Sequence, residues 1–409
     1  MKFNARHLKR ISNIAFLLLS LIFVIMLTDV TLVYIKWPSY LIHSTPDAKA
    51  LRHALFYLPC LIAALSVHIV FYRKLRKEYP EQIPNKEKPD KKKIIKRMIK
   101  ALAITIAVLL ILLLIAPYIA LPVFTGRHVN YLGYITKNNT LQDIYQASDY
   151  DLDETQRYLT TEDGIRVWTS EIYTEQPKAV MIFLSGIMQP SVTYFYGHAK
   201  YMKENQIASI LLEVRGHGQS EGSRISLGYE EVKDVRAVVD FIRSEAKYDG
   251  VPIVIQGMSM GGAIAVNSFG QIEEIDALIA MSAYSSFEDV TTDQMKGYGI
   301  PGFILKIEKP IIRSSLGLIF GKDLADQMKP IEQIKNAKGR PVLLVACTGD
   351  TEVPPINLQR LKDAYPDAQV WIRDSWEHFI VKDCNLKEVA QDKEYCDKIM
   401  DFINHSVLE

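Results

Sequence analysis

One serine of the chain lies in a pattern that can create a nucleophile. Ser259 occurs in the stretch VPIVIQGMSMGGAIAV, after an apolar run and before an alanine-rich one, with Gly257 and Gly261 two residues to either side. A strand that turns directly into a helix needs small residues at these two positions, because larger side chains would collide there. Such a turn raises the serine hydroxyl above the sheet and places the N–H of Met260 at a helix start, where it can donate to an oxyanion. The pattern G-x-S-x-G therefore predicts acyl transfer at Ser259.

Acyl transfer at a serine also needs a histidine base and a carboxylate that orients it, and in a strand–turn–helix setting these follow in the order Ser, Asp, His. Asp350 ends the strand-like stretch PVLLVACTGD, and His378 follows the last strand-like run by a few residues. Asp374 and Glu352 are rival candidates for the acid. A second oxyanion donor is expected after an early strand, where the stretch FLSGIM supplies the backbone N–H of Ile187.

Other chemistry has weaker support in the sequence. His217, in the stretch RGHG, is interpreted as part of a loop framework, and His405 as an exposed residue of the last helix. GHGQSEG is not a dinucleotide loop, because Gly222 comes one position too late for G-x-G-x-x-G. The sequence has no C-x-x-C or H-E-x-x-H, so we expect no cofactor and no metal. Cys384 and Cys396 form a disulfide in an oxidising compartment or remain two free thiols.

The elements that must position these residues follow a regular rhythm. Several apolar runs without alternation suit strands of a buried parallel sheet, and TTEDGIRVWTSEIYTE, with its Asp-Gly pair, predicts a hairpin before them. Amphipathic helical patterns lie between the runs, so we expect a doubly wound α/β domain with its chemistry at the carboxyl ends of the strands. Residues 287–340 interrupt the rhythm and are predicted to form a small helical cap. The apolar runs cover residues 179–186, 208–218, 251–257, 275–283, 341–350 and 368–374.

The first 123 of the 409 residues differ from the rest and are interpreted as a membrane anchor. Three apolar stretches, 11–33, 53–72 and 101–123, are each long enough to cross a bilayer. Two alternatives remain open, a cleaved signal for the first and a buried or interfacial helix for the second. The loop 73–100 has twelve basic and four acidic residues, which places it and the N-terminus in the cytoplasm and everything after residue 123 on the outer side, whether periplasmic, extracellular or lumenal.

The basic loop 73–100 also indicates anionic lipid headgroups as its neighbours. The formal net charge of the whole chain is only +1, and the loop has one aromatic residue, so nucleic acid is not an expected partner. Residues 124–158 are interpreted as a polar connector, and residues 159–409 as the catalytic domain. The oligomeric state cannot be predicted from the sequence.

The region from about residue 159 to 405 resembles the α/β-hydrolase family, in particular its serine aminopeptidase and monoglyceride-lipase-like branch. LEVRGHGQSEG resembles the D-x-R-G-x-G-x-S loop of that branch, with Glu213 in place of the usual Asp. QGMSMGGAIAV resembles its G-x-S-M-G-G turn, and PVLLVACTGDTEVPP its acid loop. The resemblance implies that Ser259 is the nucleophile, His378 the base and Asp350 the acid, with Ile187 and Met260 as oxyanion donors.

The sequence departs from that branch at three places. Ser185-Gly186 and Ala346-Cys347 stand where His-Gly is usual, and Glu377 stands where a glycine precedes the catalytic histidine. None of these changes removes a catalytic group, but each alters the rim of the pocket. We expect a membrane-anchored serine hydrolase that cleaves a carboxylic ester, with a small-molecule or lipid ester as substrate. The alternatives are a serine aminopeptidase, an acyltransferase, and a catalytically inactive membrane-anchored binding scaffold.

Overall fold

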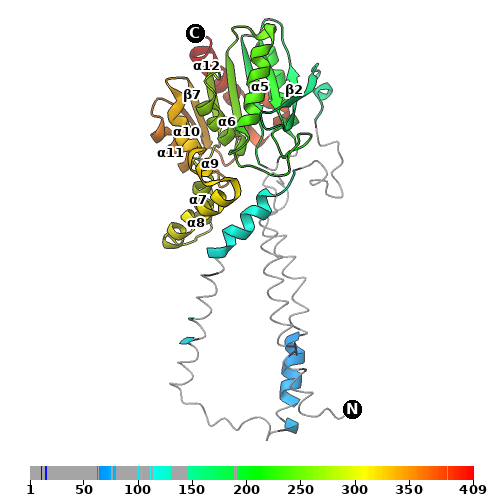
Figure 1. Ribbon diagram of the computed structural model, residues 1–409, viewed down its shortest axis with the longest axis vertical. Coiled ribbons are helices and arrows are strands. Elements are labelled where there is room, and N and C mark those ends of the chain that lie inside the picture. The colour runs from blue at the N-terminus through cyan, green and yellow to red at the C-terminus, as the bar shows by residue number, and fades with distance from the viewer. Residues whose placement is uncertain are drawn as a thin grey trace. The chain divides into compact units, whose positions relative to one another are not determined.

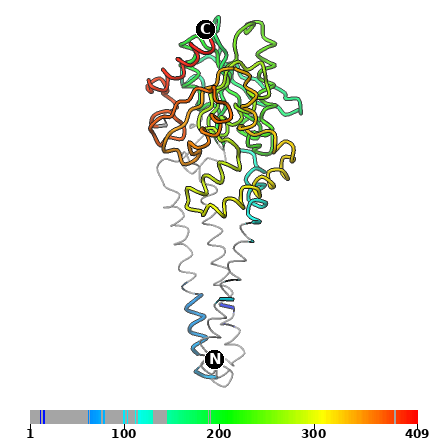
Figure 2. The backbone as a smooth tube through the Cα atoms, turned by 90° about the vertical axis from the view of Figure 1, so that its left-hand side faces the viewer, coloured from blue at the N-terminus to red at the C-terminus, as the bar shows by residue number. Residues whose placement is uncertain are grey.

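The computed structural model describes residues 114–129, 145–187, 189, 191–384 and 386–409, together with short pieces nearer the N-terminus (11, 14, 15, 62, 64–74, 77–79, 99, 100, 103 and 111). The chain divides into two compact units, residues 1–108 and 109–409. The second unit contains all the candidate catalytic residues, and Figures 1 and 2 show its described residues in colour.

The centre of this second unit is a sheet of eight strands in the order β1-β2-β4-β3-β5-β6-β7-β8. The pairs from β4 across to β8 are parallel, while β1 pairs with β2 and β2 with β4 in antiparallel fashion. The expected mostly parallel α/β sheet is therefore confirmed. The strands are β1 (Thr155–Thr160), β2 (Arg166–Ile172), β3 (Ala179–Leu184), β4 (Ile207–Leu212), β5 (Ile253–Met258), β6 (Ala277–Met281), β7 (Val342–Cys347) and β8 (Gln369–Arg373).

The apolar runs of the sequence became the inner strands because both of their faces are covered. All residues of β3, β4, β5, β6 and β7 are buried, whereas β8, at the edge, alternates. Ile182 of β3 joins the core beneath α5 and α6, and the next residue, Phe183, points the other way and stacks on Phe195. The hairpin predicted at Asp163–Gly164 joins β1 to β2.

Helices connect the strands and cover the sheet, with α5 and α6 lying in front of it in Figure 1. On α5, Val235, Val239 and Ile242 of the predicted face are buried together with Val238, and Val232 is partly buried. The predicted cap, 287–340, contains the helices α7, α8 and α9, and the short helix α10 that follows them packs against α6. The helices are α4 (Tyr196–Glu204), α5 (Val232–Ser244), α6 (Met260–Gln271), α7 (Phe287–Gly297), α8 (Gly302–Phe320), α9 (Lys322–Gln327), α10 (Pro330–Gln333), α11 (Ile356–Ala364) and α12 (Lys393–Ser406).

Residues 114–129 pack directly on the rest of the unit 109–409, which the sequence did not indicate. They are helical to residue 125, and the hydroxyl of Ser315 on α8 donates to Pro117 O at 3.0 Å. The N–H of Ile225 donates to Thr125 O at 2.8 Å, and Val129 pairs with the loop after β4. The first residues of the predicted connector, 124–158, therefore belong to this unit, and its last four form part of β1.

Most of the predicted span 11–33, half of 53–72, much of 101–123 and most of the loop 73–100 lie outside the described residues. Within the described ranges, no helix combines the length and the apolar character needed to cross a membrane.

Candidate active site

The turn at Ser259 has the strained geometry that its glycines imply. Ser259 has φ 58° and ψ −121°, a region that side chains rarely adopt, between the end of β5 and the start of α6. A Cβ on Gly257 would lie 2.0 Å from Gly261 O, and one on Gly261 would lie 2.4 Å from Leu184 O. Only glycine fits at either position, so the bend depends on these two residues. The Ser259 side chain is 8% exposed and its N–H donates to Met281 O at 2.9 Å.

The loop after β3 lies against this serine. A Cβ built on Gly186 would lie 3.3 Å from the Ser259 Cβ. The N–H of Gly186 donates to the side-chain oxygen of Gln189, which sequence analysis had not singled out. Within the described part of the chain, the N–H groups of Ile187 and Met260 donate to no protein acceptor. Both are therefore free to bind an oxyanion formed at Ser259.

Asp350 and His378 are in direct contact at the end of β7. The Nδ1 of His378 is 2.8 Å from Asp350 Oδ2, and both residues are buried, 7% and 3% exposed. The other carboxylate oxygen of Asp350 accepts from the N–H groups of Glu352 and Val353, at 2.9 and 3.0 Å. These bonds fix the carboxylate, which in turn fixes the orientation of the ring and directs Nε2 away from Asp350.

The charges at this pair shift both pKa values in the direction of an ion pair. Burial by itself would raise the pKa of Asp350, but the neighbouring His378 and the N–H of Val353 lower it below its usual value. Burial by itself would lower the pKa of His378, but the charges of Asp350 and Glu352 and the hydrogen bond to Asp350 raise it to about 9. Both shifts favour the charged forms of the pair.

Ser282, which sequence analysis missed, joins the two halves of the site. It follows the last residue of β6, has φ 44°, and its hydroxyl donates to His378 O at 2.8 Å. Its neighbour Met281 accepts the N–H of Ser259. The backbones of Ser259 and His378 are thus hydrogen-bonded to two adjacent residues, Met281 and Ser282. Among the described contacts, however, Ser259 Oγ makes no hydrogen bond to His378. A serine at the end of an apolar run was its only signal in the sequence.

Neither rival carboxylate contacts the Nδ1 atom of His378. Asp374 is exposed and accepts from the Thr348 hydroxyl at 3.0 Å. Glu352 lies on the opposite side of the imidazole from Asp350, with Oε2 3.8 Å from His378 Nε2. Asp350 is therefore the carboxylate that contacts the orienting nitrogen.

The remaining histidines named from the sequence lie elsewhere. His217 is buried with Nδ1 3.2 Å from Arg215 O, and burial lowers its pKa to about 4. His405 is exposed on α12, with its ring 2.9 Å from Asp401 O.

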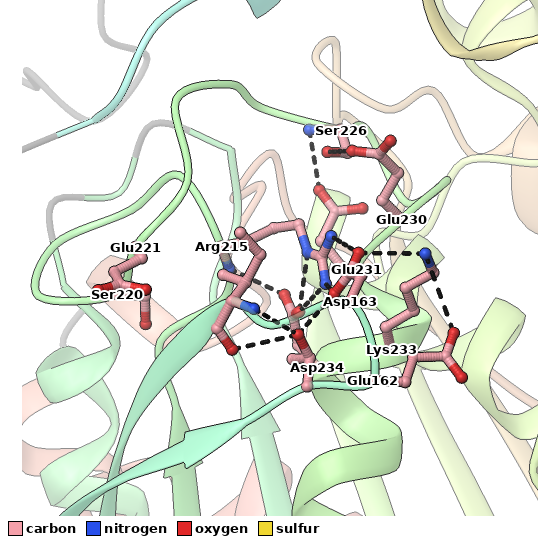
Figure 3. Close-up of polar contacts among 12 residues, drawn as sticks. Glu162, Asp163, Arg215, Ser220, Glu221, Ser226, Glu230, Glu231, Lys233 and Asp234 are labelled. Carbon is pink, nitrogen blue, oxygen red and sulfur yellow. Dashed lines mark hydrogen bonds and ion pairs between the residues drawn. The ribbon is translucent and has the colours of Figure 1, made fainter.

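A buried ionic network holds the loop that contains Arg215 (Figure 3). The guanidinium donates to Asp163 at 2.8 and 3.0 Å and to Asp234 at 2.8 Å. The Arg215 hydrogen bond holds the pKa of Asp163 well below its usual range. Next to it, the Glu231 carboxylate accepts the N–H of Ser226 at 3.0 Å. One arginine thus joins the β1–β2 hairpin, the loop after β4 and the first turn of α5.

Glu213, where the resembling loop usually has Asp, is accommodated by Gly218. Glu213 is buried, and its carboxylate accepts the N–H of Gln219 at 2.6 Å. Gly218 has φ 51°, and a Cβ there would lie 2.1 Å from the Glu213 carboxyl carbon. The longer acid therefore fills space that the glycine leaves open.

Metal and disulfide chemistry find no support in the described residues. No group of three or more His, Cys, Asp or Glu among them is arranged to hold a metal ion. Cys396 is a free, buried thiol whose Sγ lies 3.3 Å from Val389 O, which favours the alternative of two free thiols. The side chain of Cys384 lies outside the described residues.

Comparison with known proteins agrees with this fold. Residues 175–297 match the model of the family described as serine aminopeptidase, S33. The esterase Pf2001 of Pyrococcus furiosus superposes with a TM-score of 0.52 at 17% identity, over 69% of this chain and 98% of that one. Residues 109–409 therefore contain an α/β-hydrolase fold.

Two curated relatives are similar in sequence. The Arabidopsis thaliana protein named alpha/beta hydrolase domain-containing protein WAV2 is 26% identical over 218 residues, half of this chain. The uncharacterized protein YqkD of Bacillus subtilis is 28% identical over 174 residues, 41% of this chain. The matched regions span 64% and 55% of these relatives, less than two thirds of their length.

Proposed function

We propose that this chain, whose fold is that of an α/β hydrolase, is a membrane-anchored serine hydrolase that cleaves a carboxylic ester. The observation that carries the proposal is the buried Asp350–His378 pair, 2.8 Å apart, at the same sheet edge as the strained Ser259. A structural serine needs neither the strain at that position nor a buried imidazole fixed by a carboxylate nearby.

The mechanism follows from these positions. His378, in its neutral form, takes the proton of Ser259 at Nε2, and Oγ attacks the substrate carbonyl. The N–H groups of Ile187 and Met260 bind the oxyanion, and each contributes about 3 kcal/mol of transition-state stabilisation. The imidazolium then protonates the leaving alcohol, and an acyl-enzyme remains on Ser259. Water, deprotonated by His378, releases the acid and restores the serine. Asp350 stays ionised throughout and keeps the ring in its productive tautomer.

A lipid or other acyl ester is the favoured substrate. The cap helix α8 exposes large apolar side chains, with Phe303 66% and Leu318 76% exposed. The helical residues 114–125 contact α8 through Pro117 and Ser315, and they include the end of the third predicted span. A peptidase that releases N-terminal residues and an acyltransferase that uses an alcohol in place of water are alternatives on the same three residues.

The membrane anchor belongs to the proposal as well. Three apolar stretches in the first 123 residues and the basic loop 73–100 support a multi-pass anchor with a cytoplasmic N-terminus. The catalytic domain then lies on the outer side, periplasmic, extracellular or lumenal. Cysteine accessibility labelling on intact cells tests this, since the proposed topology exposes a cysteine introduced near residue 298 and protects one in the loop 73–100.

Turnover measured on the full chain in detergent micelles tests the proposed activity. Hydrolysis of p-nitrophenyl esters of increasing chain length is compared with release of p-nitroaniline from aminoacyl anilides. Ester turnover that Ser259→Ala abolishes supports the proposal. Ser268→Ala is the matched control, because this buried α6 serine has a hydroxyl without a hydrogen-bond partner among the described residues. Preference for the anilides supports the peptidase, and a folded chain without turnover and without fluorophosphonate labelling supports the inactive scaffold.

A further inference from the structure

Glu352 occupies a fixed place beside the imidazole that the proposed mechanism does not use. It lies on the loop between β7 and α11, two residues after Asp350. Its N–H donates to Asp350 Oδ1 at 2.9 Å, and its carbonyl accepts from the side chain of Gln294 on α7 at 2.5 Å. The loop and α7 therefore hold the Glu352 backbone from two sides, while its side chain is 36% exposed.

Two carboxylates thus face the two nitrogens of one ring. Asp350 is 2.8 Å from Nδ1, and Glu352 is 3.8 Å from Nε2. Nε2 is the nitrogen that must accept the Ser259 proton, yet Ser259 Oγ makes no hydrogen bond to it among the described contacts. A protonated imidazole carries an N–H on both nitrogens, so this arrangement suits an imidazolium held on two sides. In that state the ring has no lone pair with which to act as a base.

The other charged and titratable groups near the ring have different partners. The Glu377 carboxylate accepts from the Ser375 hydroxyl at 2.6 Å and from the N–H of Asp383. Asp374 accepts from the Thr348 hydroxyl. On β8, the Arg373 guanidinium pairs with Asp392, and Cys347, at the end of β7, is a buried thiol whose pKa burial raises to about 11. Among the described groups, the charges that act on His378 are those of Asp350 and Glu352.

We propose that Glu352 is a positioning residue that holds the Nε2 edge of protonated His378 in the free enzyme and so restrains the base near neutral pH. The inference rests on the proposed function, because it presupposes that His378 accepts the Ser259 proton. Loss of the Nε2 proton to solvent removes the attraction to Glu352 and frees the lone pair for Ser259. During attack the imidazolium forms again, and the same carboxylate then lies beside the new positive charge. Glu352 should therefore slow the reaction at low pH and assist it at high pH.

The test is the rate of fluorophosphonate labelling of the full chain in detergent micelles between pH 5.5 and 10. In Glu352→Gln, the pH at which the labelling rate is half of its alkaline maximum should fall by about one unit. That shift raises the labelling rate at pH 7 about tenfold. At the alkaline plateau the variant should be equal to or slower than the wild type, so that the two profiles cross. Asp374→Asn is the matched control, since it removes a nearby exposed carboxylate that does not contact the ring. Added salt should lower the midpoint of the pH–rate profile of the wild type and leave the midpoint of Glu352→Gln unchanged.

The proposal is overturned if the pH–rate profile of Glu352→Gln has the same midpoint as that of the wild type. It is also overturned if this variant is labelled more slowly by the same factor at every pH. Histidine-selective 13C NMR in the Ser259→Ala background, with the His378 signal assigned through His378→Gln, measures the same titration without turnover. If no variant is labelled at any pH, the proposed function fails. If the wild type is labelled but His378 titrates at the same pH in the presence and absence of Glu352, only the present inference fails.

Discussion

The glycine at position 257 offers a quantitative test of the turn that carries Ser259. In Gly257→Ala the new Cβ would lie 2.0 Å from Gly261 O, whereas real Cβ atoms keep at least 3.0 Å. The obstacle is backbone on both sides, so β5 and the first turn of α6 must separate by about 1 Å, and a shift of that size costs about 100-fold in rate. The overpacking itself destabilises the fold by about 1–3 kcal/mol, which is small enough for the domain to remain folded.

Fluorophosphonate labelling rates and thermal unfolding, measured on the same preparation, separate the two effects. The matched control is Gly297→Ala at the end of α7, because a Cβ there meets nothing within 4 Å and that glycine has no positive φ. We expect the control to label like the wild type, and Gly257→Ala to label about 100-fold more slowly while it still unfolds cooperatively. A folded Gly257→Ala that labels within threefold of the wild type would refute the steric account of the turn.

Other variants test the remaining contacts of the site and the fold. Because the pKa of His378 is raised to about 9 in the fold, labelling by the wild type should increase with pH toward that value, and the stability from the ion pair, complete below pH 6.5, should be lost as pH rises through about 9. Asp350→Asn should move the labelling midpoint to lower pH and reduce the plateau about 10³- to 10⁴-fold; a plateau within tenfold of the wild type would contradict its role. Ser282→Ala removes the hydrogen bond to His378 O and should slow labelling about fivefold without a change in the midpoint, and an unchanged rate would exclude Ser282 from the site. Asp234→Asn leaves the buried Arg215 without one of its carboxylates and should lower the unfolding free energy by about 3 kcal/mol; a thermal scan with no shift would show that the network contributes little.

The inner sheet could be predicted from the sequence because both faces of its strands are buried, which makes each strand a continuous apolar run. The turn at Ser259 could also be predicted, since Gly257 and Gly261 are required by local sterics. The rest depends on contacts between distant residues. Ser315 and Pro117 are 198 positions apart, and no local pattern links them. The end of the third predicted span therefore gave no sign that it packs on α8.

The choice between the two acids of one loop shows the same limit. Asp350 and Glu352 are two residues apart, and each has a carboxylate within reach of His378. Which of them faces Nδ1 is decided by the backbone N–H groups of Glu352 and Val353, which hold Asp350 Oδ1. Ser282 was missed because its left-handed φ of 44° and its bond to a carbonyl have no signature in the sequence.

The most direct test of the central claim is to find the acyl group itself. Turnover of a p-nitrophenyl ester is quenched with acid, and the chain is digested and analysed by mass spectrometry. The mechanism predicts one peptide heavier by the acyl group, with the modification on Ser259, and its loss in His378→Ala. An acyl group on any other residue, or continued turnover by Ser259→Ala, would contradict it.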